Sequence, residues 1–195
     1  MGNMKITGSK IKSVLIMIAF WGFFIFLLTQ DAGYLFGNAK IFNEALSNGT
    51  LQKNDFVEVN IKEVYGNYSY TDHMLGGIIP MGKDNHYIVK LEDDSIISLT
   101  VKDNNDIEKL DNSMEGECNL QFVGRLETPS AKIRQYYLEC IAEVGEEQLE
   151  ASAIYSDICI DATENKFTVS ILIIGCLLLA LISTAGFVFG LMKKS

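Results

Sequence analysis

Two long uncharged apolar segments constrain the fold of this chain more than any other feature of its sequence. The first runs from Ser13 to Gln30, 18 residues, and the second from Phe167 to Met192, 26 residues. A membrane-spanning helix needs roughly 20 predominantly apolar residues, each rising about 1.5 Å. As helices the two segments would reach about 27 Å and about 39 Å, and the longer one can tilt. The sequence therefore predicts two transmembrane helices, over 13–30 and 167–192.

The first segment also has the basic start and apolar centre of a cleaved signal peptide. Its apolar centre, however, exceeds the usual length of roughly 7–15 residues. The sequence Thr29-Gln30-Asp31-Ala32 that follows offers no convincing cleavage site between small residues. We therefore expect an uncleaved anchor. For the second segment the alternative is a buried helix of a soluble protein, but so small a domain has no need of 26 uncharged residues in a row.

The charges around these segments predict how the chain is oriented in the membrane. The basic residues that flank the segments on their outer sides are Lys5, Lys10, Lys12, Lys193 and Lys194. All 25 acidic residues lie between the segments, against ten basic ones over residues 31–165, so this region carries a net charge of −15. Because basic flanks favour the cytoplasmic side, residues 1–12 and 193–195 are predicted to be cytoplasmic and the centre extracytoplasmic, in a multi-pass protein of the cell membrane. A domain this acidic repels phosphate backbones, so nucleic acid is not an expected partner.

Two linkers are predicted to connect the spans to the central domain. Residues 31–54 contain an amphipathic helix within Gly37–Ser47, which stops at Asn48-Gly49. Its apolar face can lie on the bilayer surface or on the domain. Residues 143–166 are predicted to form an acidic, helical linker. The acidic residues expected on its helix are Glu146, Glu147 and Glu150.

Residues 55–142 have the pattern of a β-rich extracytoplasmic domain. The expected elements are a long strand over Asp55–Tyr70, a loop over Asp72–Asn85, a hairpin of His86–Leu91 and Ile96–Val101, a capped short helix from Asp103 to Met114, and a second hairpin of Cys118–Leu126 and Ile133–Ile141. The long strand alternates apolar and polar residues and is expected to bend at Gly66. Five strands and one helix in this order match an OB-like, partly open barrel, with another small α+β sheet as the alternative.

The second expected hairpin indicates a disulfide bridge. If Leu126 lies opposite Lys132, the same register places Cys118 opposite Cys140 and aligns two further apolar pairs on one face. In an oxidising compartment such a pair can form a bridge, and the alternative is reduced thiols. No cysteine or histidine spacing fits a metal site, so neither a metal nor another cofactor is expected.

The candidate ligand or partner surface lies near the bent strand and consists of Tyr65, Tyr68, Tyr70 and His73. Aromatic side chains provide ligand contacts in many small barrels, whereas the alternative is that these tyrosines only pack at the domain edge. The two histidines, His73 and His86, fit no catalytic motif. We predict no catalytic residues and do not expect an enzyme.

Within the second apolar segment, Gly186 and Gly190 form a Gly-x-x-x-Gly motif, which permits close contact between helices. The contact can be with the first span or with a second copy of the chain, which would make a homo-oligomer. Neither segment contains a charge, which argues against a transport path.

The Lys-flanked anchors, Phe56–Tyr70 and the hairpin Tyr87–Val101 together resemble uncharacterised bacterial two-pass membrane proteins with a small β-rich, OB-like extracytoplasmic domain. The resemblance covers most of the chain and implies no known activity. Our leading hypothesis is a doubly anchored interaction module, an accessory or scaffold protein that contacts the lipid bilayer and a membrane or envelope protein. The alternatives are a membrane-tethered sensor of a small molecule or cation, using the 72–85 loop and the nearby tyrosines, and thirdly a membrane enzyme using His73, His86 or nearby acids.

Overall fold

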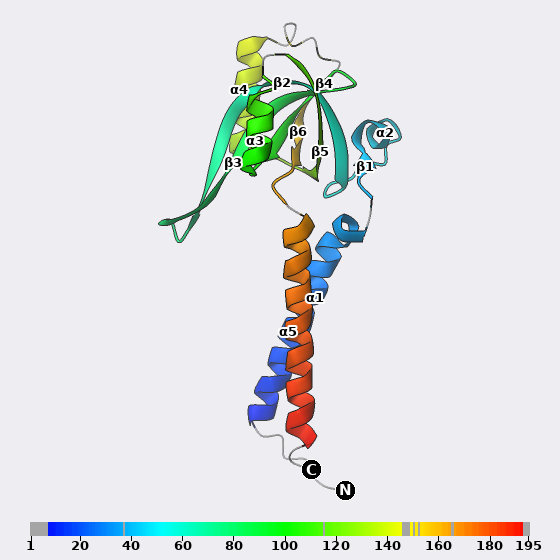
Figure 1. Cartoon of the computed structure of the whole chain (residues 1–195), viewed down its shortest axis with the longest axis vertical. Coiled ribbons are helices and arrows are strands. Elements are labelled where there is room, and N and C mark those ends of the chain that lie inside the picture. Colours follow the sequence, from blue (N-terminus) through cyan, green and yellow to red (C-terminus); the bar gives the residue numbers. More distant parts are fainter. Residues whose placement is uncertain are drawn as a thin grey trace. The chain divides into compact units, whose positions relative to one another are not determined.

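The computed structural model describes residues 8–36, 38–114, 116–145, 149, 151, 153–164 and 166–192. The chain divides into two compact units. One comprises residues 1–37 and 165–195 and contains two apolar helices, and the other is Asn38–Glu164, a mixed six-stranded sheet with three helices (Figure 1). The predicted arrangement of two apolar helices flanking a β-rich region is confirmed.

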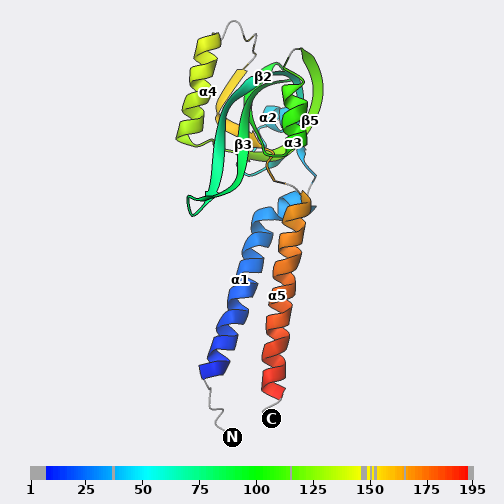
Figure 2. The same cartoon turned by 60° about the vertical axis from the view of Figure 1, so that its left-hand side comes forward.

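The helical unit consists of α1 (Gly8–Phe36) and α5 (Lys166–Met192), which lie side by side in both views (Figures 1 and 2). Within them, Ile11–Thr29 and Val169–Phe189 are long and apolar enough to span a membrane. The share of buried residues is 0% in the first of these stretches and 11% in the second. A core helix of a soluble protein would be mostly covered by other side chains, so this exposure is what lipid-facing helices require.

The contact between α1 and α5 includes one polar link and two buried small or branched residues. Trp21 Nε1 donates a hydrogen bond to Thr184 Oγ1 at 3.0 Å, and Ala180 and Ile173 are buried. Gly186 lies off this contact, because a Cβ added there would meet nothing within 4 Å. Of the two partners considered for the glycine motif, α1 is therefore not the one that Gly186 contacts. The surroundings of Gly190 lie outside the described part of the chain, and contact with a second copy stays a prediction.

The sheet of the second unit has the order β1-β2-β3-β4-β6-β5, and β2 also pairs with β5, so five of the strands are paired in a closed cycle. The strands are β1 (Lys40–Ile41), β2 (Phe56–Leu75), β3 (Ile79–Leu91), β4 (Ser95–Val101), β5 (Glu117–Glu127) and β6 (Ala153–Asp161). The β1–β2 and β4–β6 pairings are parallel and the others antiparallel. The predicted hairpin around residues 92–95 is confirmed as β3 and β4.

Strand β2 can serve two neighbours because it is long and bent. Residues 56–63 pair with β5 and residues 61–75 with β3. Its register shifts at three points between Ile61 and Ser69, one of them at Gly66, whose φ is 149°. Glycine tolerates this backbone conformation, which L side chains rarely adopt. The predicted bend at Gly66 is confirmed.

Apolar and polar residues alternate along the strands, and the apolar side chains on the inner face form one main core. The buried members are Phe42, Val57, Val59, Ile61, Val64, Tyr87, Val89, Leu91, Ile97, Leu99, Val101, Leu110, Phe122, Leu126 and Ile160. Phe42 comes from α2 (Phe42–Ser47), so the apolar face of this helix lies on the domain. Leu110 comes from α3 (Asn104–Asp111), where Asp103 accepts a hydrogen bond from the Asn105 backbone N–H as the predicted cap.

The strand predicted over Ile133–Ile141 is wrong, because Ala131–Val144 forms the helix α4. Ser130 caps this helix by accepting a hydrogen bond from the Ile133 N–H at 3.3 Å, and strong helix formers fill its exposed positions. The hairpin that would have aligned two thiols therefore does not exist. Cys118 lies on β5 and Cys140 on α4, and both are free, so the predicted bridge is also wrong.

Two other segments differ from their predictions. Ala153–Asp161, expected to belong to a helical linker, forms β6 and supplies the fifth strand of the cycle. The sequence expected to be the 72–85 loop instead continues β2 and β3 as a hairpin with a turn at residues 76–78. Glu146, Glu147 and Glu150, predicted on the linker helix, lie outside the described residues.

Gly124 tests the pairing of β5 with β6. A Cβ at this position would come within 2.7 Å of both Asp161 O and Ile160 Cγ2, so Gly124→Ala must displace β6. We expect a loss of about 1–3 kcal/mol in the free energy of unfolding, measured by urea denaturation of the full chain in detergent. Gly116→Ala is the control, because a Cβ there meets nothing within 4 Å. Equal stability of the two variants would contradict the β5–β6 pairing.

Candidate functional site

An open groove of about 780 Å³ lies between β2 and the first turns of α4. We call it the tyrosine groove. Its lining residues are Asn67, Tyr68, Ser69, Tyr70, Thr71, Asp72, Ser130, Lys132, Ile133 and Tyr136. One wall is a continuous stretch of β2 and the other is the N-terminal part of α4. Side chains on one face of β2 recur at every second residue, and those on one face of α4 at every third or fourth.

The second wall is positioned by the packing of α4 on the outer face of the sheet, opposite the main core. Tyr137 and Ile141 of α4 are buried against Ile88 of β3 and Ile96 of β4. Figure 2 shows α4 along the outside of the sheet. Tyr137 also donates a hydrogen bond to the Ile96 carbonyl oxygen at 3.3 Å. This apolar contact fixes the helix and leaves its first turns free to form the wall.

Tyr68 forms the inner part of the groove. Its hydroxyl makes a 2.7 Å hydrogen bond with Ser98 Oγ, and its ring meets the Tyr137 ring edge-on at 5.7 Å between centroids. Burial raises the pKa of the Tyr68 hydroxyl above its ordinary value. Tyr68 is therefore a neutral, fixed aromatic surface with its polar end already satisfied.

His86 lies beside Tyr68 and is bonded through both ring nitrogens. Nε2 is 2.9 Å from Thr71 Oγ1, and Nδ1 is 2.9 Å from Thr100 Oγ1. The side chain is 7% exposed, and burial lowers its pKa below 6.5. A neutral imidazole donates through one nitrogen and accepts through the other, which two threonine hydroxyls can match. With both nitrogens engaged, His86 supports β2 from behind and is not available to a substrate.

The rim of the groove presents two tyrosines, each with a lysine over its ring. Lys83 Nζ is 3.5 Å from the centroid of the Tyr70 ring, and Lys132 Nζ is 5.6 Å from that of Tyr136. Tyr70 is exposed and comes from β2, whereas Tyr136 is half-buried and comes from α4. The two walls thus each contribute one aromatic–cation pair, which can stack on an aromatic or planar group and attract an anionic one.

The predicted surface residues are only partly brought together. Tyr68 and Tyr70 line the groove. Tyr65 does not, and its hydroxyl donates to the Leu149 carbonyl oxygen at 2.9 Å. His73 lies farther along β2, where it is bonded to Asp84 on β3. The sequence does not predict that Lys132, Ile133 and Tyr136 of α4 line the groove, because the pattern of their segment indicates a strand.

No group of three or more His, Cys, Asp or Glu side chains that could hold a metal occurs among the residues that the structure describes. Cys118, Cys140 and Cys159 lie in the sheet unit, and burial raises the pKa of each thiol, for Cys159 to about 12. A thiol with a raised pKa is a weak nucleophile near neutral pH. The groove offers a ligand aromatic rings, hydroxyls, the Asn67 amide, the Asp72 carboxylate and the Lys132 ammonium group, with Lys83 over the ring of Tyr70.

In the comparison with known protein families, one family model covers nearly the whole chain. A model for a domain of unknown function, DUF8577, matches residues 3–193. This chain belongs to the DUF8577 family. No curated protein and no solved structure matches it. Because the match covers both apolar helices as well as the sheet, the DUF8577 family model includes all of these elements and not the sheet alone.

His86 gives the stability of this DUF8577 protein a pH dependence of known sign. Its folded-state pKa lies below the unfolded value of 6.5, so the unfolded chain binds the proton more tightly. Stability is therefore full above pH 6.5 and is lost as pH falls toward the folded pKa, with a slope of at most about 1.4 kcal/mol per pH unit. His86→Gln keeps hydrogen-bonding capacity without a titratable ring. In thermal unfolding from pH 7.5 to pH 5.5, the variant should lose less stability than the wild type, and parallel curves would contradict this account.

Proposed function

We propose that this protein is a doubly membrane-anchored interaction module of the bacterial cell envelope, without catalytic activity of its own, that holds a partner protein in the tyrosine groove. The observation that carries the proposal is the pair of tyrosines on opposite walls of one groove, Tyr70 and Tyr136, each with a lysine over its ring. Tyrosine is enriched where proteins meet, because it gives a large contact area at low conformational cost.

The proposed domain architecture is an OB-like barrel with an added helix. Five strands pair in a closed cycle, β4 and β6 run parallel, and α3 connects β4 to β5. Barrels of this kind bind extended ligands across one face with the aid of loops. Here α4, inserted between β5 and β6, supplies a second wall beside β2. This supports an extended protein segment as the ligand.

The charge distribution supports an extracytoplasmic position and a protein partner. Residues 38–164 contain 24 acidic and ten basic residues, a net charge of −14. Phosphate backbones are repelled by such a domain. Five lysines, namely Lys5, Lys10, Lys12, Lys193 and Lys194, lie on the far sides of the two apolar stretches, which favours cytoplasmic termini and an outward-facing domain. Two anchors restrict the search of the domain to neighbours in the same membrane, as suits a scaffold or accessory subunit.

A second candidate function is a membrane-tethered sensor. The groove volume of about 780 Å³ falls within the range of roughly 300–1,000 Å³ usual for small-molecule sites. In that case the occupant would be a small planar or anionic molecule held between the two tyrosines.

Photocrosslinking in living cells tests the proposed function. A benzoylphenylalanine placed at Tyr136 or at Tyr70 should yield adducts with the same envelope protein, because the two positions face one groove. Position Lys109 on α3 is the control, since it is exposed and does not line the groove. Asn67→Ala should reduce the adduct from position 136 several-fold, because Asn67 lines the groove and is exposed.

Different adducts from the two groove positions, or the same adducts from Lys109, would contradict the interaction module. If no protein adduct forms but the melting temperature of the full chain rises saturably with one compound of a metabolite panel, the sensor is supported instead.

A further inference from the structure

The hairpin formed by the end of β2 and the start of β3 is an arm that pairs with no other strand in the part of the chain that the structure describes. Its two strands are Thr71–Leu75 and Ile79–Asp84, joined by the turn at residues 76–78. The pairing of β3 with β4 begins only at Asn85, and that of β2 with β5 ends at Glu63. Figure 1 shows this β2–β3 arm as a narrow ribbon that projects from the sheet.

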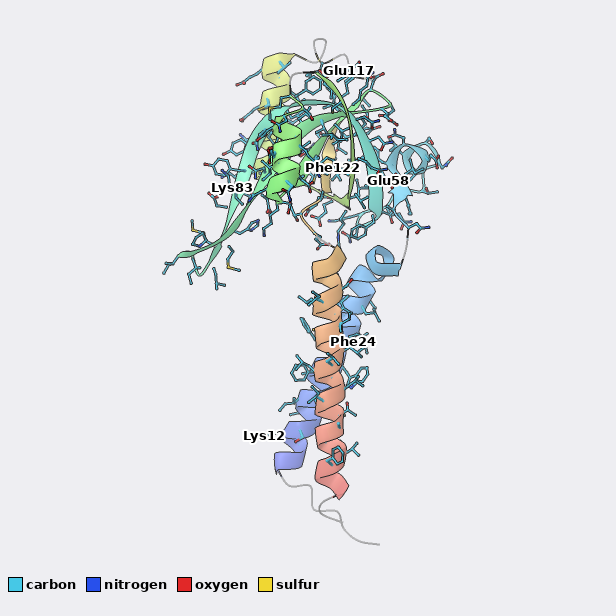
Figure 3. The ribbon with its side chains drawn as sticks, in the orientation of Figure 1. Lys12, Phe24, Glu58, Lys83, Glu117 and Phe122 are labelled. Carbon is cyan, nitrogen blue, oxygen red and sulfur yellow. The ribbon has the colours of Figure 1, made fainter. Side chains whose placement is uncertain are left out.

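The end of the β2–β3 arm is apolar on both strands. Ile78 is 84% exposed, and four other apolar side chains of the arm are more than half exposed. These four are Met74, Leu75, Ile79 and Met81. No residue from 74 to 82 carries a charge. So many large apolar side chains gathered at one projecting point mark an interaction site. Figure 3 shows side chains extending outward from the end of the arm.

Most backbone hydrogen-bonding groups of the arm are paired between its own two strands. Met74 pairs with Pro80 and Leu75 with Ile79, and the Ile78 N–H donates to the Leu75 carbonyl oxygen at 3.3 Å. Pro80 has no N–H to satisfy. Entry into a hydrocarbon environment is costly mainly for unpaired backbone groups, so a closed hairpin tip is suited to it.

The base of the arm carries the residue types that mark a membrane–water boundary. Tyr70 is exposed beneath Lys83, and the stem of Lys102 lies over Gly82, with Cε 2.8 Å from the position of an added Cβ. Lys83 lies at the wide end of the arm (Figure 3). Tyrosine rings prefer the headgroup level, and lysines extend their ammonium groups toward phosphates. Along the arm, the apolar side chains lie at the tip and the tyrosine and two lysines lie toward the base. A hairpin that enters a bilayer tip first would need this order.

We propose that the tip of the β2–β3 arm inserts into the interfacial layer of the bilayer that anchors the chain. The inference rests on the membrane anchoring in the proposed function and adds a third lipid contact to it. Seven residues, 162–168, separate β6 from the second apolar stretch. Even fully extended they reach only about 25 Å. The arm is itself about 17 Å long, from the five residues of its shorter strand, so the lipid surface is an apolar partner that stays at a distance comparable with the arm's own length.

Fluorescence quenching in vesicles tests this insertion. The full-length chain, with its four native cysteines replaced and Ile78→Cys labelled with an NBD dye, is reconstituted into phosphatidylcholine–phosphatidylglycerol vesicles. Lipids that carry a nitroxide near the headgroup should quench the dye at least twofold more than the same dye at Lys109→Cys, and its emission should shift to the blue. Trp21, the one tryptophan of the chain, lies near the middle of the apolar stretch of α1, and its quenching by lipids that carry the nitroxide deep in the acyl chain reports anchoring in wild-type vesicles.

The outcomes separate the arm from the anchoring. Quenched Trp21 with an unquenched, water-like dye at position 78 overturns insertion and leaves the anchors intact. If neither is quenched, the anchoring proposal fails and the insertion with it. A blue-shifted dye that escapes quenching and follows the protein-to-lipid ratio overturns insertion in favour of a second copy of the chain.

A second measurement avoids removal of the native cysteines. A diazirine amino acid at Ile78, in the otherwise unchanged chain, should give a phospholipid adduct by mass spectrometry, and the same amino acid at Lys109 should give none. Protein adducts without lipid adducts from position 78 overturn the inference.

Discussion

The domain depends on the ability of β2 to pair on both of its edges along different parts of its length. Residues 56–63 lie against β5 and residues 61–75 against β3, which closes the cycle of strands around the main core. A straight strand of 20 residues would extend far beyond its neighbours, and the shifts between Ile61 and Ser69 allow this one to turn instead. The wall of the tyrosine groove and the β2–β3 arm are both continuations of the same strand.

Two surfaces of opposite chemistry thus follow one another along β2. Residues 67–72 present rings, amides and hydroxyls supported from behind by Ser98 and by His86. Beyond them the end of the arm, residues 74–82, presents uncharged, exposed apolar side chains. We propose a protein partner for the first and lipid for the second. A domain that touches the bilayer at its arm would hold the groove in a restricted orientation, which increases the effective concentration of a membrane-bound partner.

Much of the local structure could be predicted, because short-range patterns determine it. Asp103 caps α3, and the alternation in β3 and β4 around an acidic turn leaves little choice but a hairpin. The prediction of a strand over Ile133–Ile141 is wrong because the apolar residues of this segment fit both the two-residue period of a strand and the 3.6-residue period of a helix. A register that aligned Cys118 with Cys140 favoured a strand, while the Ser130 cap and the spacing of Ile133, Tyr137 and Ile141 favoured the helix that forms. Because the helix was not predicted, the second wall of the tyrosine groove was not predicted either.

The remaining errors concern contacts that are distant in sequence. The β6 strand pairs with β4 and β5 across long connections, and its acidic surroundings resemble a linker. The arm contains two adjacent glycines and Pro80, which usually indicate a loop. Gly76 and Gly77 instead form its turn, and Pro80 lies in a hairpin that pairs with no further strand among the described residues. Tyr68 and Tyr70 were found from sequence because strand position and residue type alone indicated them, whereas Tyr136 required the tertiary fold.

The most direct test of the account is the side of the membrane on which the sheet unit lies. In a chain without native cysteines, a single cysteine at the exposed turn residue Glu92 or at Lys12 is offered a membrane-impermeant maleimide on intact cells. The account predicts labelling at position 92, and labelling at position 12 only after the membrane is permeabilised. Labelling of position 12 on intact cells, with position 92 protected until permeabilisation, would contradict it.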